Sequence, residues 1–128
     1  MFIIIKTQEY LKDFNKLDKS DQLRVIKIIN QLKERGDEIG KPLSGLHYFR
    51  EKKFNGKRLL FLIYKDLNTI LIPAITDKKL QQTTINNTLI NLLEYNQYVI
   101  DIVKNSLKVI FQFQTSHVLN PLSFFLSF

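Results

Sequence analysis

The first part of the chain combines one short apolar run with two stretches of helical spacing. Residues 2–6 are rich in β-branched residues and predict a strand. Thr7 is a suitable N-cap, and apolar residues at 10, 11, 14 and 17 then predict a helix. After the polar residues 18–21, a second helix is predicted to end at Gly36. Its expected apolar stripe consists of Leu23, Ile26, Ile28 or Ile29, and Leu32.

The middle of the chain carries strand signals. A loop with Gly and Pro at 40–45 precedes predicted strands at 46–54 and 57–64, which flank Asn55-Gly56, a strong signal for a two-residue hairpin turn. A third strand at 69–76 contains Pro73, which lacks an N–H and therefore requires an edge or a bulge. Asp77 then predicts the cap of a last helix that ends near 95–98. The order β-α-α-β-β-β-α predicts an α+β fold, with the helices packed on a small, mainly antiparallel sheet.

The C-terminal part of the chain has a different character. Residues 101–128 contain three charged residues, and their phenylalanines show no clear helical or strand period. Nine of the last twenty residues are Gln, Thr, Ser, His, Asn or Pro, which is too polar for a membrane-spanning helix. We therefore place one domain in residues 1–100. We expect residues 101–128 to be an apolar extension, either packed on the domain or poorly ordered, that is dispensable for the core.

Positive charge is concentrated at the predicted hairpin. The net charge is +7, and residues 41–58 carry six Lys or Arg against one Asp or Glu, whereas residues 1–40 carry eight against seven. Such a patch attracts a polyanion or an acidic protein, although an edge hairpin kept soluble by lysines would also account for it. The chain has no Cys, and MFIIIKTQEY predicts a strand rather than a signal peptide. We therefore expect a cytoplasmic protein.

The two-residue turn fixes which hairpin side chains are neighbours. It places Lys53 directly opposite Arg58. Such a like-charge pair is destabilising unless solvent screens it or an anion neutralises it. Glu51 lies diagonally within reach of such a cation. Three further basic residues point to the other face of the hairpin: Arg50, Lys52 and Lys57.

A second basic pair, Lys78-Lys79, follows the third predicted strand. In a meander, the end of that strand lies beside the start of the preceding one, so we expect this pair near the Asn-Gly turn. The acidic residues of 9–38 fall on amphipathic helices and predict solvated faces. No His, Asp or Glu cluster has metal-ligand spacing, so neither a metal nor another cofactor is expected.

The family resemblance of the chain lies in its element order and in three segments: KPLSGL, FREKKFNGKRLLFLIY and ITDKKLQQTTI. In these features the chain resembles the RelE/ParE superfamily of type II toxins, nearest to its HigB-like branch. The resemblance covers about residues 2–98. The family's Glu-Leu-Arg-like, Tyr-Arg-like and Lys-Lys-x-Gln-like elements correspond to residues 51–53, 57–58 and 78–81. The resemblance implies a RelE-like fold and a ribosome-dependent, metal-independent endoribonuclease that cleaves mRNA. The resemblance also implies a cognate antitoxin as a partner, whereas the polar residues of the C-terminal segment predict that no membrane is involved.

The resemblance also implies roles for individual residues. Arg58 would hold the scissile phosphate, and Lys53 would lie beside it as a phosphate ligand or general base. Lys79, or less readily Lys78, would complete the catalytic site. Lysine and arginine can stabilise the phosphorane formed by attack of the RNA 2′-OH without a metal. The remaining candidates for RNA binding are Arg50, Lys52, Lys57 and Lys78.

Two alternatives remain open. Some family members carry a catalytic Tyr or His in the last helix, where this sequence has Thr84 and Ile85. This difference favours a ParE-like toxin, which binds DNA gyrase without cutting RNA. A second alternative is an RNA- or ribosome-binding module without chemistry, because the fold by itself does not determine the activity.

Overall fold

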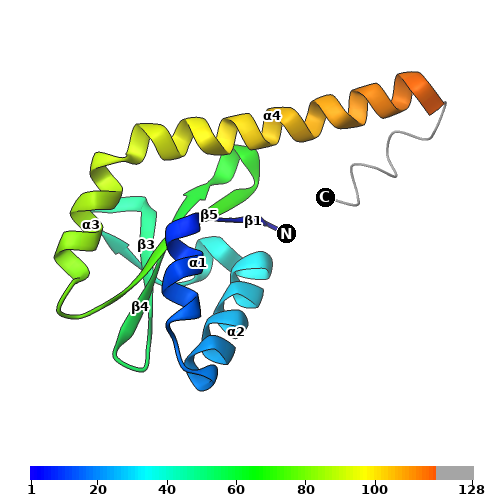
Figure 1. Ribbon diagram of the computed structural model, residues 1–128. Coiled ribbons are helices and arrows are strands. Elements are labelled where there is room, and N and C mark those ends of the chain that lie inside the picture. The colour runs from blue at the N-terminus through cyan, green and yellow to red at the C-terminus, as the bar shows by residue number, and fades with distance from the viewer. Residues whose placement is uncertain (118–128) are drawn as a thin grey trace. The chain divides into compact units, whose positions relative to one another are not determined.

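The computed structural model describes the backbone of residues 1–117 and the side chains of residues 1–108 (Figure 1). Residues 1–91 form one compact unit, and a second unit begins at Leu92. The helices are α1 (Gln8–Asn15), α2 (Lys19–Arg35), α3 (Gln81–Ile90) and α4 (Leu92–His117), with short 3-10 turns η1 (Gly36–Glu38) and η2 (Lys65–Leu67). The strands are β1 (Ile3–Lys6), β2 (Lys41–Leu43), β3 (Leu46–Phe54), β4 (Lys57–Tyr64) and β5 (Thr69–Asp77).

The five strands form one mixed sheet in the order β1-β5-β4-β3-β2. β1 pairs in parallel with β5, and the other three pairings are antiparallel. The predicted α+β class and mainly antiparallel sheet are therefore confirmed. The prediction missed β2, which lies within the Gly- and Pro-containing loop at 40–45. β2 is a three-residue edge strand with Pro42 opposite Arg50, a place where a missing N–H is tolerated.

Helices α1 and α2 cover one face of the sheet, as Figure 1 shows. Thr7 caps α1, because its Oγ1 accepts a hydrogen bond from the Tyr10 N–H. The predicted apolar stripe of α2 is wrong in part, since Leu23 and Ile26 are exposed. The buried stripe has the same i, i+3, i+4, i+7 spacing but a different phase. It consists of Val25, Ile28, Ile29 and Leu32.

Pro73 lies in a bulge, one of the two settings that its missing N–H requires. The register of β4 against β5 shifts between Leu60 and Leu62, opposite the segment that contains Pro73. β1 has ended by this point, and residues of α1 and its cap satisfy the backbone of β5 instead. Thr7 Oγ1 donates to the Pro73 carbonyl (2.8 Å), and Asp13 Oδ2 accepts from the Ile75 N–H (3.0 Å). Asp13 therefore has a structural partner, whereas the sequence predicted a solvated face.

The C-terminal helical part differs from the prediction in two ways. The cap is confirmed in part, because Asp77 Oδ1 accepts a hydrogen bond from the Leu80 N–H, but α3 begins only at Gln81. The predicted end near Tyr95–Tyr98 is wrong. α3 ends at Ile90, and α4 continues to His117. Residues 101–117 are thus helical, and residues 118–128 of the predicted extension lie outside the described part of the chain.

The boundary between a domain at 1–100 and an extension at 101–128 stays a prediction, and truncation after Ile100 tests it. Residues 1–91 form a compact unit by themselves, so we expect the shortened chain to keep one cooperative thermal transition within about 5 °C of the full chain. Circular dichroism at increasing temperature measures this transition. Loss of cooperativity would show that residues beyond Ile100 belong to the folding unit.

Candidate functional site

The β3–β4 hairpin has the register that its sequence predicts. Asn55 and Gly56 form the turn, both with positive φ, and Lys53 pairs directly with Arg58. Alternation then separates the basic residues into two groups. Lys53 and Arg58 lie on the face of the sheet away from α1 and α2. On the face toward those helices, beside the buried Phe54, are Arg50, Lys52 and Lys57.

Arg58 is a buried cation with an incomplete set of partners. Its side chain is 10% exposed, and the neighbouring Glu51 side chain is 7% exposed. Arg58 Nε lies 3.8 Å from Glu51 Oε2, which is an ion pair but too long for a hydrogen bond. Among the described residues, Arg58 Nε has no hydrogen-bond partner, while its Nη1 donates to the Gly56 carbonyl (3.3 Å). An unused donor on a buried guanidinium is costly, and an incoming anion would satisfy it.

The first residue of α3 completes this cluster. Gln81 Nε2 donates to Glu51 Oε2 at 2.6 Å. The same carboxylate oxygen that faces Arg58 is therefore also held by Gln81. The sequence indicated the contact between Glu51 and a hairpin cation, but it gave no signal for the contact with Gln81, thirty residues away.

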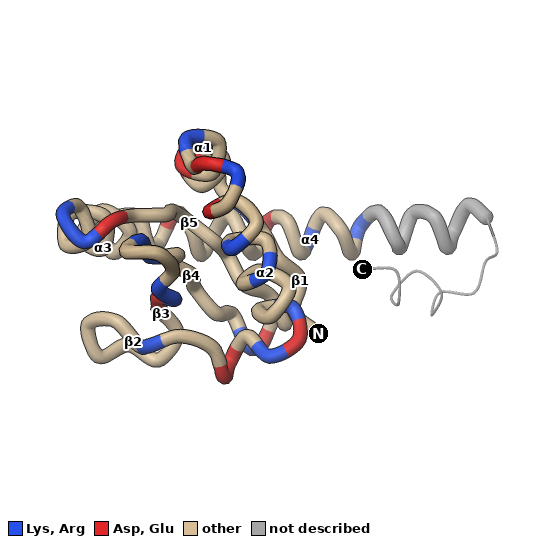
Figure 2. Tube along the Cα trace, turned by 90° about the horizontal axis from the view of Figure 1, so that it is seen from below, with Lys and Arg blue, Asp and Glu red and all other residues tan. Residues whose placement is uncertain are grey.

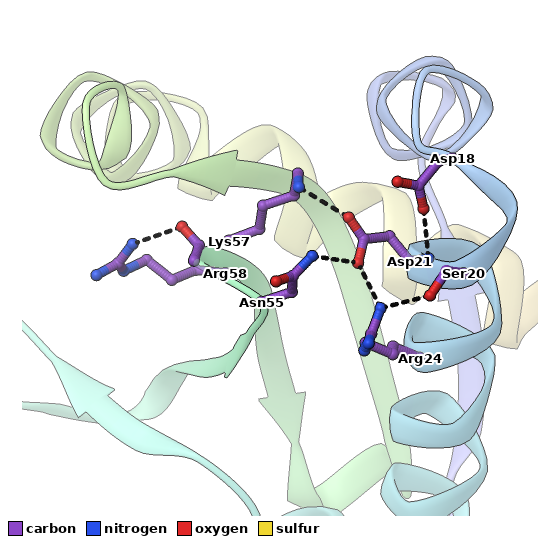
Figure 3. A network of polar contacts seen from close by, with 8 residues as sticks. Asp18, Ser20, Asp21, Arg24, Asn55, Lys57 and Arg58 are labelled. Atoms are coloured by element: carbon purple, nitrogen blue, oxygen red, sulfur yellow. Dashed lines mark hydrogen bonds and ion pairs between the residues drawn. The ribbon is translucent and has the colours of Figure 1, made fainter.

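Lys57 has an intramolecular partner on the opposite face. Its Nζ lies 2.8 Å from Asp21 Oδ2, near the start of α2, and Asn55 Nδ2 donates to Asp21 Oδ1 (3.0 Å). Arg24 also reaches Asp21 Oδ1, at 3.1 Å. Figure 3 shows Lys57 extending toward α2, while Arg58 extends to the other side of the hairpin. The Asp21 side chain is only 1% exposed, so the predicted solvated face is wrong at this position.

These contacts determine how Asp21 titrates. Hydrogen bonds from Lys57 and then from Asn55 lower the pKa of the Asp21 carboxyl below its ordinary value, against the opposing effect of burial. A lowered folded-state pKa stabilises the fold above the unfolded-state pKa of about 3.9. That contribution is lost as the pH falls through the folded-state pKa.

Replacing Asp21 by asparagine should therefore weaken the fold at pH 7 and remove part of its acid sensitivity. The asparagine cannot form an ion pair with Lys57 at pH 7. It also does not titrate, so no ion pair is lost when the pH falls. Urea unfolding from pH 7 to pH 2.5 measures the effect: we expect the wild-type advantage to shrink steadily below about pH 4. The exposed Asp66→Asn is the matched control and should follow wild type. An Asp21→Asn curve parallel to wild type at every pH would contradict this role.

The second basic pair lies in the turn between β5 and α3. Lys78 and Lys79 are exposed, and they follow Asp77, the residue that pairs with Lys57 at the hairpin end of the sheet. Figure 2 shows basic residues on β3 and on the segment that leads into α3. The pair is thus at the end of the sheet that the sequence predicted.

The position of the absent Tyr or His holds no ionisable group. Thr84 Oγ1 lies 3.1 Å from Thr76 Oγ1, and Ile85 is buried. Thr84, Thr76 and Lys57 help to line a cavity of about 260 Å³ between α1, the end of β5 and the start of α3. In the part of the chain that the structure describes, no group of three or more His, Cys, Asp or Glu could hold a metal ion.

No protein-family model matches the chain, and no curated protein matches it. Solved structures do. The toxin–antitoxin complex RelBE2 from Mycobacterium tuberculosis matches with a TM-score of 0.53 and 20% identity, over 60% of this chain and 98% of that one. A mutant of the E. coli toxin RelE in the free state matches with a TM-score of 0.57 and 12% identity, over 67% and 96%. The chain has the RelE fold.

An archaeal structure extends this likeness. The RelB–RelE antitoxin–toxin complex from Methanococcus jannaschii matches with a TM-score of 0.52 and 13% identity, over 62% of this chain and 96% of that one. The RelE fold predicted from the sequence is therefore confirmed. No helix among the described residues of this RelE-fold chain is long and apolar enough to cross a membrane.

Proposed function

We propose that this chain is the toxin of a type II toxin–antitoxin system and a ribosome-dependent mRNA endonuclease that inhibits translation. The observation that carries the proposal is Arg58, a buried guanidinium whose Nε–H has no acceptor among the described residues, beside the exposed Lys53. This arrangement suits a phosphate at the hairpin of a RelE fold. The three solved structures described above are a RelE toxin and complexes of such a toxin with its antitoxin, which supports an antitoxin partner here.

In the proposed reaction a base takes the proton of the RNA 2′-OH, the 2′ oxygen attacks the adjacent phosphorus, and the P–O5′ bond breaks as the leaving 5′ oxygen receives a proton. Lys and Arg side chains can supply the base, the charge stabilisation and the proton, so the proposal requires no metal or other cofactor. Arg58 binds the phosphate oxygens and stabilises the charge of the phosphorane. Lys53 lies directly across the strand pair, with Cβ atoms roughly 5 Å apart, and acts as a second phosphate ligand or as the base. Lys79, or Lys78, reaches the phosphate or the leaving oxygen from the turn before α3.

The four remaining residues predicted to bind RNA fall into two groups, those with and those without an intramolecular partner in the part of the chain that the structure describes. Arg50 donates from Nε to the His47 carbonyl, and Lys57 is paired with Asp21, so both have structural partners. Among the described residues, Lys52 and Lys78 have no such hydrogen bond or ion pair, and they keep their proposed part in RNA binding. The HigB-like branch and a location in the cytoplasm remain predictions.

Induction of the chain in a bacterium tests the proposal. We expect growth arrest, with new mRNA 5′ ends that primer extension maps within translated regions. A ParE-like gyrase toxin, favoured by Thr84 and Ile85 in place of a catalytic Tyr or His, would instead give DNA damage with intact mRNA. An RNA-binding module would bind RNA with a strong salt dependence and give no cleavage product.

A further inference from the structure

We infer that Glu51 is an internal counter-ion for Arg58, which competes with the RNA phosphate and so lowers the affinity of the site for anions. The inference rests on the proposed function, because it describes how the same site takes its phosphate. Glu51 is the only acidic residue among residues 41–58, and its side chain is almost completely buried beside Arg58.

Burial makes this charge pair matter. A carboxylate on the surface would be screened by water and salt, but the Glu51 and Arg58 side chains are only 7% and 10% exposed. In such a setting, a phosphate that approaches Arg58 meets a fixed negative charge at close range. Binding therefore requires either displacement of the Glu51 carboxylate or acceptance of its repulsion.

A hydrogen bond from Gln81 fixes the position of the Glu51 carboxylate. Gln81 Nε2 donates to Glu51 Oε2 at 2.6 Å, while the same oxygen stays 3.8 Å from Arg58 Nε. The carboxylate thus balances the charge of Arg58 without using the Nε donor, which remains unbonded among the described residues. Gln81 holds the carboxylate away from this donor, which is itself buried, so a phosphate oxygen reaches it only when neighbouring side chains move.

Two substitutions then have opposite effects on the same site. Glu51→Gln keeps the size of the side chain and removes its charge, so anions should bind more tightly. Gln81→Ala releases the carboxylate to close on Arg58, so anions should bind more weakly. If Gln81 acts only through Glu51, the effect of Gln81→Ala disappears in the Glu51→Gln background.

Binding of a short single-stranded RNA and of inorganic phosphate to the full-length protein tests the inference without using cleavage. If Glu51 blocks Arg58 about nine-tenths of the time, Glu51→Gln should tighten binding about tenfold. Gln81→Ala should weaken binding at least threefold. The control Asp66→Asn removes the same charge from the exposed turn η2, at the other end of β4, and should change binding less than twofold.

The inference is overturned if Glu51→Gln binds no more tightly than Asp66→Asn, binds more weakly than wild type, or shows no anion binding at all. Thermal melting establishes that each variant is folded, and the Gln81→Ala arm stands independently if Glu51→Gln is unstable. Cleavage of mRNA on induction reports the proposed function separately. If Glu51→Gln binds anions more tightly but induction of the chain produces no mRNA cleavage, the counter-ion role of Glu51 stands and the nuclease is refuted. If induction produces cleavage but Glu51→Gln leaves anion binding unchanged, the nuclease stands and the counter-ion role is refuted.

Discussion

Arg58→Ala should lower mRNA cleavage about 100- to 1,000-fold and restore growth to induced cells. Arg58 is the buried cation proposed to stabilise the phosphorane, and removal of one such preorganised donor typically has this magnitude. The measurements are the growth rate after induction and the yield of new mRNA 5′ ends. Cells that recover while producing the variant at wild-type levels would support the role of Arg58 in catalysis.

The control for this experiment is Arg35→Ala, which removes the same type of side chain from an exposed position at the end of α2. It should leave toxicity intact. Arg58→Ala also leaves the buried Glu51 carboxylate without its counter-ion, which destabilises the fold. A cooperative melting transition of the purified variant is therefore needed to show that loss of toxicity is not caused by unfolding. Continued growth arrest with a folded Arg58→Ala chain would contradict the nuclease and favour the gyrase-binding alternative.

Gly40→Ala should destabilise the fold by roughly 2–4 kcal/mol. Gly40 has a φ of +79°, and a Cβ there would lie 2.5 Å from the Glu51 carbonyl oxygen. That oxygen belongs to the backbone of β3 and cannot rotate away. Urea unfolding at neutral pH measures the loss, and the midpoint should fall without a change in slope.

Gly45→Ala is a matched control, because Gly45 has a φ of +71° but no atom within 4 Å of an added Cβ. It should cost only about 1 kcal/mol, the cost of the left-handed backbone alone. The difference between the two variants isolates the contact with β3. Equal losses would show that the contact beside Glu51 relaxes freely.

The hairpin was predictable because its information is local. Asn55-Gly56 specifies a two-residue turn, and that turn alone determines that Lys53 faces Arg58. The same local logic predicted that Lys57 and Arg58 lie on opposite faces. The buried face of a helix was less predictable where two phases of apolar spacing coexist, as in α2, where Val25 is buried and Leu23 is exposed.

The polar contacts between distant segments were not predictable. Asp21 looks like an ordinary acidic residue in the first turn of a helix, because its partners Asn55 and Lys57 follow more than thirty positions later. Gln81 meets Glu51 only after β5 brings α3 to the hairpin. The continuation of α4 to His117 was missed because residues beyond 100 combine few charges with scattered phenylalanines.

The parallel pairing of β1 with β5 has a consequence for the time course of synthesis. Ile3 pairs with Thr69, so β1 leaves the ribosome well before its partner strand β5 has been made. At ordinary translation rates this interval is roughly 3–13 s, whereas β3 and β4 can pair as soon as both are made. The nascent chain therefore exposes Ile3-Ile4-Ile5 for seconds before its partner exists. A chaperone that binds short apolar segments has this interval in which to act.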